Sequence, residues 1–199
     1  GLDPKKTPHE KLYQRHALLA QDPLFSAKHI QKNQLEKFAN DFATVYNKAW
    51  AGHGGLKQLS TKEVLAQFNK MKPIMDEKIV WFAYYQNNPI AIFISLPDLN
   101  QWFKHLNGKF GLWQKLKFVW LKTFKHNKKF CGIAFGIVPE WQQKGVDAYI
   151  IIEAAKVVQP QRKHYTEYEM QWIGDFNPKM LNVAKSIGDT FETRKLATY

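Results

Sequence analysis

The stretch of sequence best suited to chemistry is residues 137–146, which reads IVPEWQQKGV. Its composition predicts a strand that ends, a turn, and a helix that begins. The first N–H groups of a helix have no partners inside the helix and carry partial positive charge, so a diphosphate can bind there. Gly145 has no side chain and therefore lets phosphates approach the backbone closely. Residues 137–146 thus predict an anion site at the start of a helix.

Patterns for several other chemistries do not occur in the sequence. There is no G-x-S-x-G, Walker A or dinucleotide-binding fingerprint, so hydrolase, NTPase and dehydrogenase functions lack support. The seven histidines form no HxxxH or HxH pattern, and a single cysteine cannot build a Cys-cluster zinc site, so we expect no metal. We expect Cys131 to be a small buried hydrophobic residue rather than a nucleophile.

The charge of the chain points to an anionic partner. Lys and Arg number 29 against 17 Asp and Glu, which gives a formal net charge of +12. No acidic residue occurs between Asp98 and Glu140, where eight lysines are interleaved with large apolar groups. Three interpretations of this basic segment stay open: a surface helix hairpin packed on the core, an interfacial membrane element, or a nucleic-acid surface.

Hydrophobic periodicity and turn residues predict the order of the elements. Ser60 and Glu63 form a capping-box pattern at the start of one helix. Helices are expected at residues 9–20, about 33–50, from 60 onward, in two pieces within 98–129, at 146–158 and at 177–187. Strands are expected at 79–85, 90–96, 130–138, 165–173 and 191–199, with 86–89 as a turn long enough to hold Pro89, and residues 24–30 are expected to be an edge strand or an extended lead-in. This order predicts a mixed sheet flanked by helices.

Length and composition predict the domain organisation and the compartment. Of the 199 residues, 1–31 are expected to be an N-terminal lead-in. Residues 32–199 are expected to form one domain with a helical insertion at about 98–129. The chain begins with Gly1 rather than Met, so we expect a piece of a longer protein. A single cysteine fits a reducing, cytoplasmic setting. The apolar stretches are too short for a transmembrane helix, and none has the pattern of a signal peptide.

Residues 142–147 resemble the pyrophosphate-binding loop of the GNAT superfamily of acyl-CoA N-acyltransferases, whose pattern is Gln/Arg-x-x-Gly-x-Gly/Ala. Gln142 and Gly145 match this pattern, whereas Asp147 replaces the final small residue. A carboxylate there would repel phosphates unless it points away. The predicted element order is similar to the whole topology of that fold. Residues 46–50, 96–100 and 170–178 resemble more narrowly the C-terminal domain of poorly characterised bacterial two-domain GNAT-like proteins.

The resemblance implies a mixed α/β, GNAT-like fold with a central, mostly antiparallel sheet. It implies acetyl-CoA or another acyl-CoA as a substrate, with the pantetheine arm in a splay between the strands at 130–138 and 165–173. It also implies a set of CoA-binding residues: Ile137 and Val138 beside the thioester, Gln142, Gln143, Lys144, Gly145 and Val146 at the phosphates, and Asn177 at the head of the last helix. On this basis we expect Gly145→Glu to abolish CoA binding and to leave the protein folded.

The resemblance supplies fewer catalytic residues than CoA-binding residues. Many members of the superfamily place a Tyr in the last helix as the acid for the departing thiolate, and the corresponding position here is Ala184. Three alternatives follow from the missing Tyr. Another residue serves as the acid, the thiolate leaves without an acid, or the domain does not catalyse the reaction. Glu169 is the first candidate for a general base because it lies in mid-strand beside the expected splay. The alternative is a surface glutamate paired with a lysine.

Three functions follow from these observations. The first is an acyl-CoA-dependent N-acyltransferase that moves an acyl group, expected to be acetyl, to an unknown amine by direct attack. The second is a catalytically inactive GNAT-like domain that binds CoA, or serves an N-terminal GNAT-like domain of the full-length protein or a homodimer. The third is a binding surface for anionic membrane or nucleic acid on residues 102–129.

Overall fold

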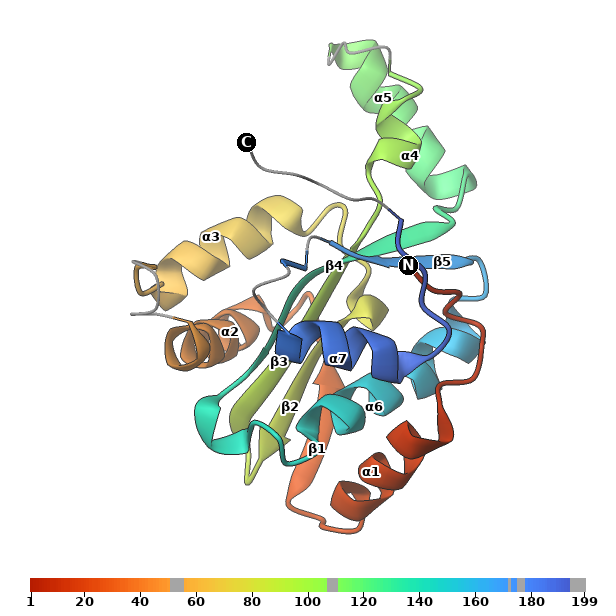
Figure 1. The fold of residues 1–199 in the computed structure, drawn as a ribbon. Coiled ribbons are helices and arrows are strands. Elements are labelled where there is room, and N and C mark those ends of the chain that lie inside the picture. Colours follow the sequence, from red (N-terminus) through yellow and green to blue (C-terminus); the bar gives the residue numbers. More distant parts are fainter. Residues whose placement is uncertain (51–55, 107–110, 172, 175–177, 194–199) are drawn as a thin grey trace.

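The computed structural model describes residues 1–50, 56–106, 111–171, 173–174 and 178–193 (Figure 1). In this part of the chain, seven α-helices and one five-stranded mixed sheet form the α/β fold that the sequence predicts. The strands are β1 (Phe25–His29), β2 (Val80–Tyr85), β3 (Asn88–Pro97), β4 (Lys129–Ile137) and β5 (Glu167–Met170). The helices are α1 (Glu10–Ala20), α2 (Leu35–Ala49), α3 (Thr61–Met71), α4 (Asn100–Phe103), α5 (Leu112–Phe124), α6 (Val146–Gln161) and α7 (Pro178–Ile187).

The strands lie in chain order across the sheet, β1-β2-β3-β4-β5. Neighbouring strands from β1 to β4 are antiparallel, and β4 and β5 are parallel. The turn between β2 and β3 is shorter than expected: Gln86 and Asn87 both have positive φ, which matches the twist of a two-residue hairpin. Pro89 therefore lies inside β3, opposite Tyr84 at a register shift, and not in the turn.

Helices cover both faces of the sheet (Figure 1). The face covered by α2 and α3 is opposite the face covered by α6 and α1. Phe38 of α2 packs on Phe82 of β2, and α6 is buried along most of its length because residues on all sides of it are apolar. Both halves of the capping box between Ser60 and Glu63 are present at the start of α3, as predicted. The β strands and α6 thus form the core that holds the rest of the fold.

The C-terminal third differs from expectation at several boundaries. α6 continues past residue 158 to Gln161 and includes Pro160 in its last turn. β5 covers Glu167–Met170 only, so the expected strand at 165–173 is too long at both ends. Residues 191–193 form no strand in the structure, although the Phe191 N–H donates to the Gly1 carbonyl oxygen at 2.9 Å, and residues 194–199 lie outside the described residues.

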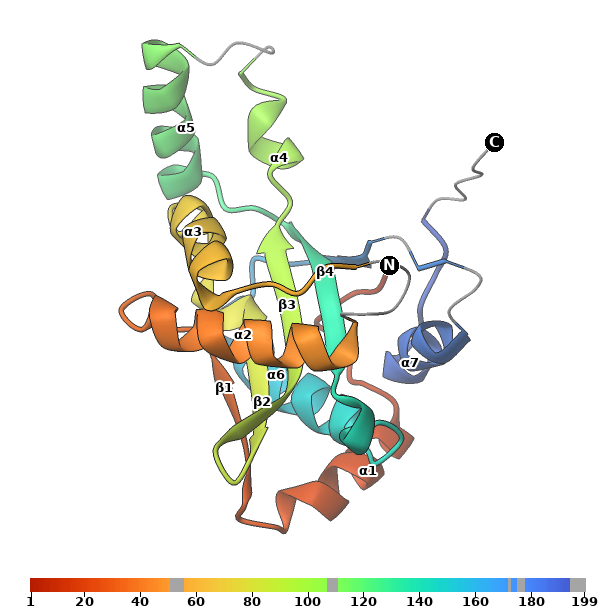
Figure 2. The same cartoon turned by 90° about the vertical axis from the view of Figure 1, so that its left-hand side faces the viewer.

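The basic segment forms an arm that projects from the body, as both views show (Figures 1 and 2). We use the name arm for α4, α5 and the described residues that join them to β3 and β4. Trp102, Leu106 and Leu121 form a small apolar cluster of their own between the two helices. On the body side, the Lys122 ammonium contacts the Pro73 carbonyl oxygen. None of the helices in the described part of the chain has both the length and the apolar character needed to cross a membrane.

An ion pair joins the end of α6 to the segment before β2. The Arg162 guanidinium donates to both Asp76 carboxylate oxygens, at 2.7 and 3.0 Å, and the Tyr165 hydroxyl donates to Oδ2 at 3.2 Å. Burial alone would raise the pKa of Asp76. The hydrogen bonds from Arg162, from the Lys78 N–H and from Tyr165 outweigh burial, so the pKa lies below its ordinary value.

Replacing Arg162 with Met should lower the free energy of unfolding by about 2 kcal/mol near neutral pH, because a largely buried carboxylate loses two charged hydrogen bonds. Since the pKa of Asp76 is lower in the folded than in the unfolded chain, this contribution is complete above the unfolded pKa and is lost as pH falls through the folded pKa. The difference between wild type and variant in urea titrations should shrink below about pH 4. The neighbouring exposed Lys163→Met is the control, and a difference that does not change with pH would contradict this account.

Candidate active-site cleft

A cleft opens where β4 and β5 separate. The two strands pair in parallel from Lys129 and Glu167 to Gly132 and Met170, and the Gln171 N–H still reaches the Gly132 carbonyl oxygen at 3.2 Å. Beyond that point β4 continues to Ile137 without β5, although β3 still pairs with its other side. The cleft on this side has a volume of about 560 Å³. Its lining comes from α1, α2, β4, the loop before α6, α6 itself and α7: Arg15, Ala49, Trp50, Phe135, Gly136, Ile137, Gln142, Gln143, Asp147, Met180, Asn182, Val183 and Ser186.

The backbone of β4 turns N–H groups toward this cleft. The Val138 N–H donates to the Ile90 carbonyl oxygen of β3 at 3.0 Å. Because N–H groups alternate in direction along a strand, the Ile137 and Phe135 N–H groups point to the opposite side, where β5 no longer pairs. The Ile137 carbonyl oxygen faces the same way and accepts from the Gln142 side-chain amide at 3.2 Å. Ile137 therefore presents its N–H to the cleft, whereas the Val138 N–H is already occupied and its side chain is buried.

The loop before α6 brings Gln142 and Gln143 to the cleft wall. α6 begins after Gly145 without a side-chain cap, so the first N–H groups of the helix are available to an anion. Gly145 has φ +88°, a left-handed conformation that favours glycine. A Cβ there would face α1, 3.6 Å from the Arg15 carbonyl oxygen and 3.7 Å from Leu19. These are ordinary van der Waals distances, so the strain in Gly145→Glu would come from the positive φ rather than from a clash, and the expectation that the variant stays folded remains a prediction.

The other predicted phosphate-binding residues are placed differently. The Lys144 ammonium lies 5.2 Å from the centre of the Trp141 ring on the exposed surface of the loop. Val146 opens α6, and its side chain is fully buried in the core. Val146 can therefore contact an anion only through its backbone N–H. Asn177 lies outside the described residues.

Asp147, the departure from the family pattern, is paired rather than free. Its carboxylate is buried and accepts from the Arg15 guanidinium of α1 at 2.5 Å. Arg15 is partly exposed and itself lines the cleft. The pair cancels the negative charge beside the start of α6 and places a guanidinium, a good phosphate donor, at the same wall.

Trp50 fixes the shape of the opposite wall. It follows α2 and lies against Gly136 of β4, where an added Cβ would be 2.2 Å from the ring. The indole therefore covers the backbone of β4 at a position that only glycine allows. Sequence reasoning did not select Trp50 or Arg15 as site residues. Trp50 could be suspected because it stands at the end of a helix on the cleft side, whereas nothing in the local sequence around Arg15 indicates its partner.

The candidate catalytic residues lie away from the cleft lining. Glu169 is on the paired part of β5, where its carboxylate contacts the Lys129 ammonium and accepts from the Thr193 hydroxyl at 3.0 Å. Ala184 is buried on α7. Among the described residues that line the cleft, the acidic one is Asp147. Cys131 is buried, and burial raises the pKa of its thiol, so the thiolate is disfavoured.

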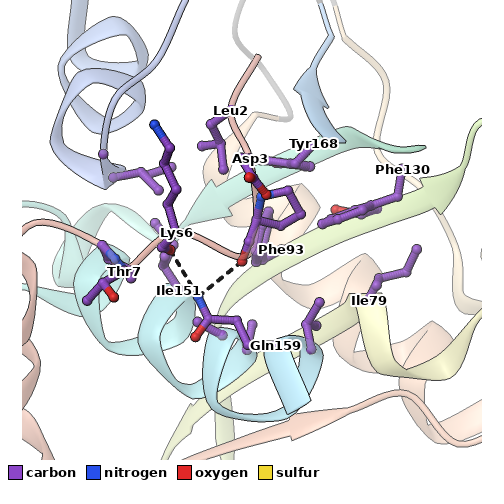
Figure 3. A pocket seen from close by; sticks show the side chains of 18 of the residues that line it. Leu2, Asp3, Lys6, Thr7, Ile79, Phe93, Phe130, Ile151, Gln159 and Tyr168 are labelled. Atoms are coloured by element: carbon purple, nitrogen blue, oxygen red, sulfur yellow. Dashed lines mark hydrogen bonds between the residues drawn. The ribbon is translucent and has the colours of Figure 1, made fainter. Parts of the chain in front are cut away.

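A second, smaller cavity lies between the sheet and α6, beneath the N-terminal segment (Figure 3). Its walls are mostly apolar, with Phe93, Phe130, Ile151 and Tyr168 among them. The Gln159 side-chain amide donates to the carbonyl oxygens of Pro4 and Lys6, which holds the N-terminal segment over the cavity. The cation that lines this cavity, Lys6, is paired with Asp189 at 3.5 Å, so the cleft beside β4 remains the candidate active site.

Comparison with solved structures identifies the fold. An aminoglycoside acetyltransferase from an uncultured soil metagenomic sample, in complex with sisomicin, superimposes with a TM-score of 0.57 at 13% identity, over 91% of this chain and 97% of that one. An aminoglycoside N-acetyltransferase in complex with CoA gives a TM-score of 0.51 at 16% identity, over 88% and 93%. The chain has the fold of the GNAT superfamily, as the resemblance in its sequence predicts.

Comparison of sequences finds similarity to curated proteins. No protein-family model matches the chain. A bacterial ceramide synthase from Caulobacter vibrioides is 23% identical over 168 residues, which is 82% of this chain and 43% of that protein. The chain spans well under half the length of the curated relatives that it matches.

A double-mutant cycle tests the Arg15–Asp147 pair. Arg15→Gln leaves a buried carboxylate without its partner and should lower the free energy of unfolding more than Asp147→Asn does. The double variant should be less destabilised than the sum of the two, with a coupling of about 1 kcal/mol because Arg15 is partly exposed. Urea unfolding of the four proteins measures this coupling, and strictly additive effects would show that the pair contributes nothing.

Proposed function

We propose that the cleft binds an acyl-CoA and that the domain is a GNAT-type N-acyltransferase. One observation carries this proposal: the uncapped start of α6 and the unpaired N–H groups of β4 border the same cleft. The first suits a diphosphate, and the second suits an extended molecule that carries carbonyl groups. Neighbours with the same fold, including one solved in complex with CoA, support a CoA-linked acyl donor.

The acceptor is proposed to be a long-chain amine. Ceramide synthase, the name of the similar Caulobacter protein, describes formation of an amide between an acyl group and an amino alcohol with a long alkyl chain. The acetyltransferases of the same fold also acylate amines, but their likeness to this chain extends to the fold alone. The sequence likeness therefore favours a lipid amine over an aminoglycoside, and it favours an acyl group longer than the acetyl that we expected from sequence.

Direct attack accounts for the reaction. The amine nitrogen attacks the thioester carbonyl carbon, the C–N bond forms, the C–S bond breaks, and the sulfur leaves as a thiolate that takes up a proton. The Ile137 N–H points toward the space where the carbonyl oxygen would carry developing negative charge, and a fixed donor there lowers the barrier. Glu169 is proposed to accept the proton of the amine through water, because it lies outside the cleft lining, opposite Cys131 on the paired part of β5.

A second candidate function is a CoA-binding domain without catalysis. Two observations favour it: Ala184 stands where many superfamily members carry a Tyr, and Glu169 is held by Lys129 and Thr193 away from the cleft lining. Both candidates require CoA in the same cleft, and turnover separates them.

Adding negative charge to the loop should abolish CoA binding without disturbing the fold. Gln143 and Lys144 are exposed, so Gln143→Glu/Lys144→Glu should fold normally and repel the phosphates, with affinity at least about tenfold weaker. The control variant, Gln161→Glu/Lys163→Glu, makes the same chemical changes at the other end of α6. Gln161 lies about 24 Å from Gly145 along the helix.

Thermal shift with CoA measures this effect. At ~100 times its dissociation constant a ligand stabilises by about 2.7 kcal/mol, which corresponds to a shift of roughly 5–10 °C for a chain of this size. Wild type and the Gln161→Glu/Lys163→Glu control should both show it. No shift in wild type, or an equal shift in the Gln143→Glu/Lys144→Glu variant, would remove CoA from this cleft.

Turnover is tested by release of free CoA thiol from palmitoyl-CoA and acetyl-CoA in the presence of sphinganine, a long-chain amino alcohol. We expect release with palmitoyl-CoA that depends on the amine. If Glu169 accepts the proton, Glu169→Gln should lower the rate at least about tenfold and leave CoA binding unchanged. An unchanged rate would remove Glu169 from the mechanism. CoA binding without any amine-dependent release would favour the non-catalytic domain.

A further inference from the structure

α5 lies on the arm that projects from the body (Figures 1 and 2), and one side of this helix carries large exposed hydrophobic side chains. Each of them is 55–79% exposed, and they recur at helical spacing: Leu112, Trp113, Leu116, Val119, Trp120 and Phe124. At 100° per residue they occupy an arc of about 140°. The other side of the helix, with Phe118 and Leu121, packs against α4. The exposed arc is thus additional to the arm's own small core.

Lysines border this apolar arc on both edges. The helical spacing places Lys115 and Lys122 along one edge and Lys117 along the other. No acidic residue occurs in the sequence between Asp98 and Glu140, so nothing within the arm neutralises these charges by a carboxylate. The Lys117 ammonium donates to the His105 carbonyl oxygen at 2.7 Å and the Lys122 ammonium contacts the Pro73 carbonyl oxygen, so both charges stay beside the face, whereas Lys115 can extend its ammonium outward. The surface therefore has an apolar centre and cationic margins.

We propose that this face of α5 binds the surface of a bilayer that contains anionic phospholipids. A helix with such a face lies in the interface plane, with its apolar side in the boundary between headgroups and acyl chains. Trp113 and Trp120 are of the residue type that prefers this boundary. Lys115 can reach the level of the headgroups, and the charges of Lys117 and Lys122 beside the face add to the attraction of the anionic surface.

Two other partners fit the same surface less well. A nucleic acid would need cations at the centre of the face, whereas the centre here is formed by Leu116 and Trp120, which offer no cation to a phosphate backbone. A second copy of the chain would bring two lysine-bordered faces together, and like charges would oppose each other. A bilayer with anionic headgroups complements both the apolar centre and the cationic edges.

The placement of the arm leaves the cleft accessible when the arm is bound. β4 begins at Lys129, directly after the arm, and reaches the cleft at Phe135, about 20 Å further along the strand. The start of α6 lies beyond the end of β4, at the end of the strand away from the arm. Docking through α5 therefore holds the body beside the bilayer without covering the loop before α6. This inference does not depend on acyl transfer, and its test contains no CoA.

Co-sedimentation with vesicles tests the proposal. The whole chain should bind vesicles of phosphatidylcholine and phosphatidylglycerol in equal parts, and bind pure phosphatidylcholine vesicles at least about tenfold more weakly. Leu112→Ser/Leu116→Ser/Trp120→Ser should lose binding at least about tenfold. The matched control Leu18→Ser/Leu24→Ser/Leu56→Ser removes three exposed leucines of the body and should bind like wild type. Circular dichroism should show that both triple variants are folded.

Tryptophan fluorescence tests where contact occurs. Emission should shift to shorter wavelength when mixed vesicles are added, and Trp113→Phe/Trp120→Phe should lose the shift while it still binds. Equal binding by the two triple variants would overturn the proposal, as would no binding of wild type to mixed vesicles. A dimer that the α5 triple variant dissociates, or tighter binding to double-stranded DNA than to mixed vesicles, would also overturn it in favour of a second copy or a nucleic acid.

Discussion

The parallel pairing of β4 with β5 ends after four residue pairs, and the candidate site depends on this limit. Had the pairing continued, the Ile137 N–H would donate to β5 and the space beside Gly136 would hold a strand. Because β5 departs, β4 keeps one side open over its last residues while β3 still supports the other side. The same divergence gives α7 room to form the far wall of the cleft. One short ladder therefore determines where a ligand can enter a sheet that is otherwise closed.

Charge is distributed between two separate places in the molecule. At the cleft, the carboxylate of Asp147 is matched by Arg15, so the positive end of α6 is not cancelled by an unpaired anion. On the arm, lysines stand at the edges of an apolar face with no carboxylate nearby in the sequence. The first arrangement suits one small anion held at close range, and the second suits an extended anionic surface. The high net charge of the chain thus does not describe a single binding site.

Local signals in the sequence predicted the elements well. The capping box at Ser60, the apolar spacing of α2 and the strand-turn-helix pattern before α6 each depend on residues close together in the chain, and the GNAT fold follows from their order. The site was only partly predictable because its walls come from distant segments. Arg15 meets Asp147 across 132 positions, and Trp50 covers Gly136 from another layer. The direction of a Cβ at Gly145 follows from a positive φ and from the position of α1, and neither can be read from a six-residue motif.

The open side of β4 also bears on aggregation. Unpaired N–H groups on a strand can pair with a strand from another chain, which is the usual route to edge-to-edge aggregation. Here Trp50 and α7 both line the cleft along that edge. A slender molecule can enter, whereas an incoming strand would also have to displace the helix. If α7 came loose, the same backbone groups would become a template for intermolecular strand pairing. The helix that closes the cleft therefore also protects the sheet.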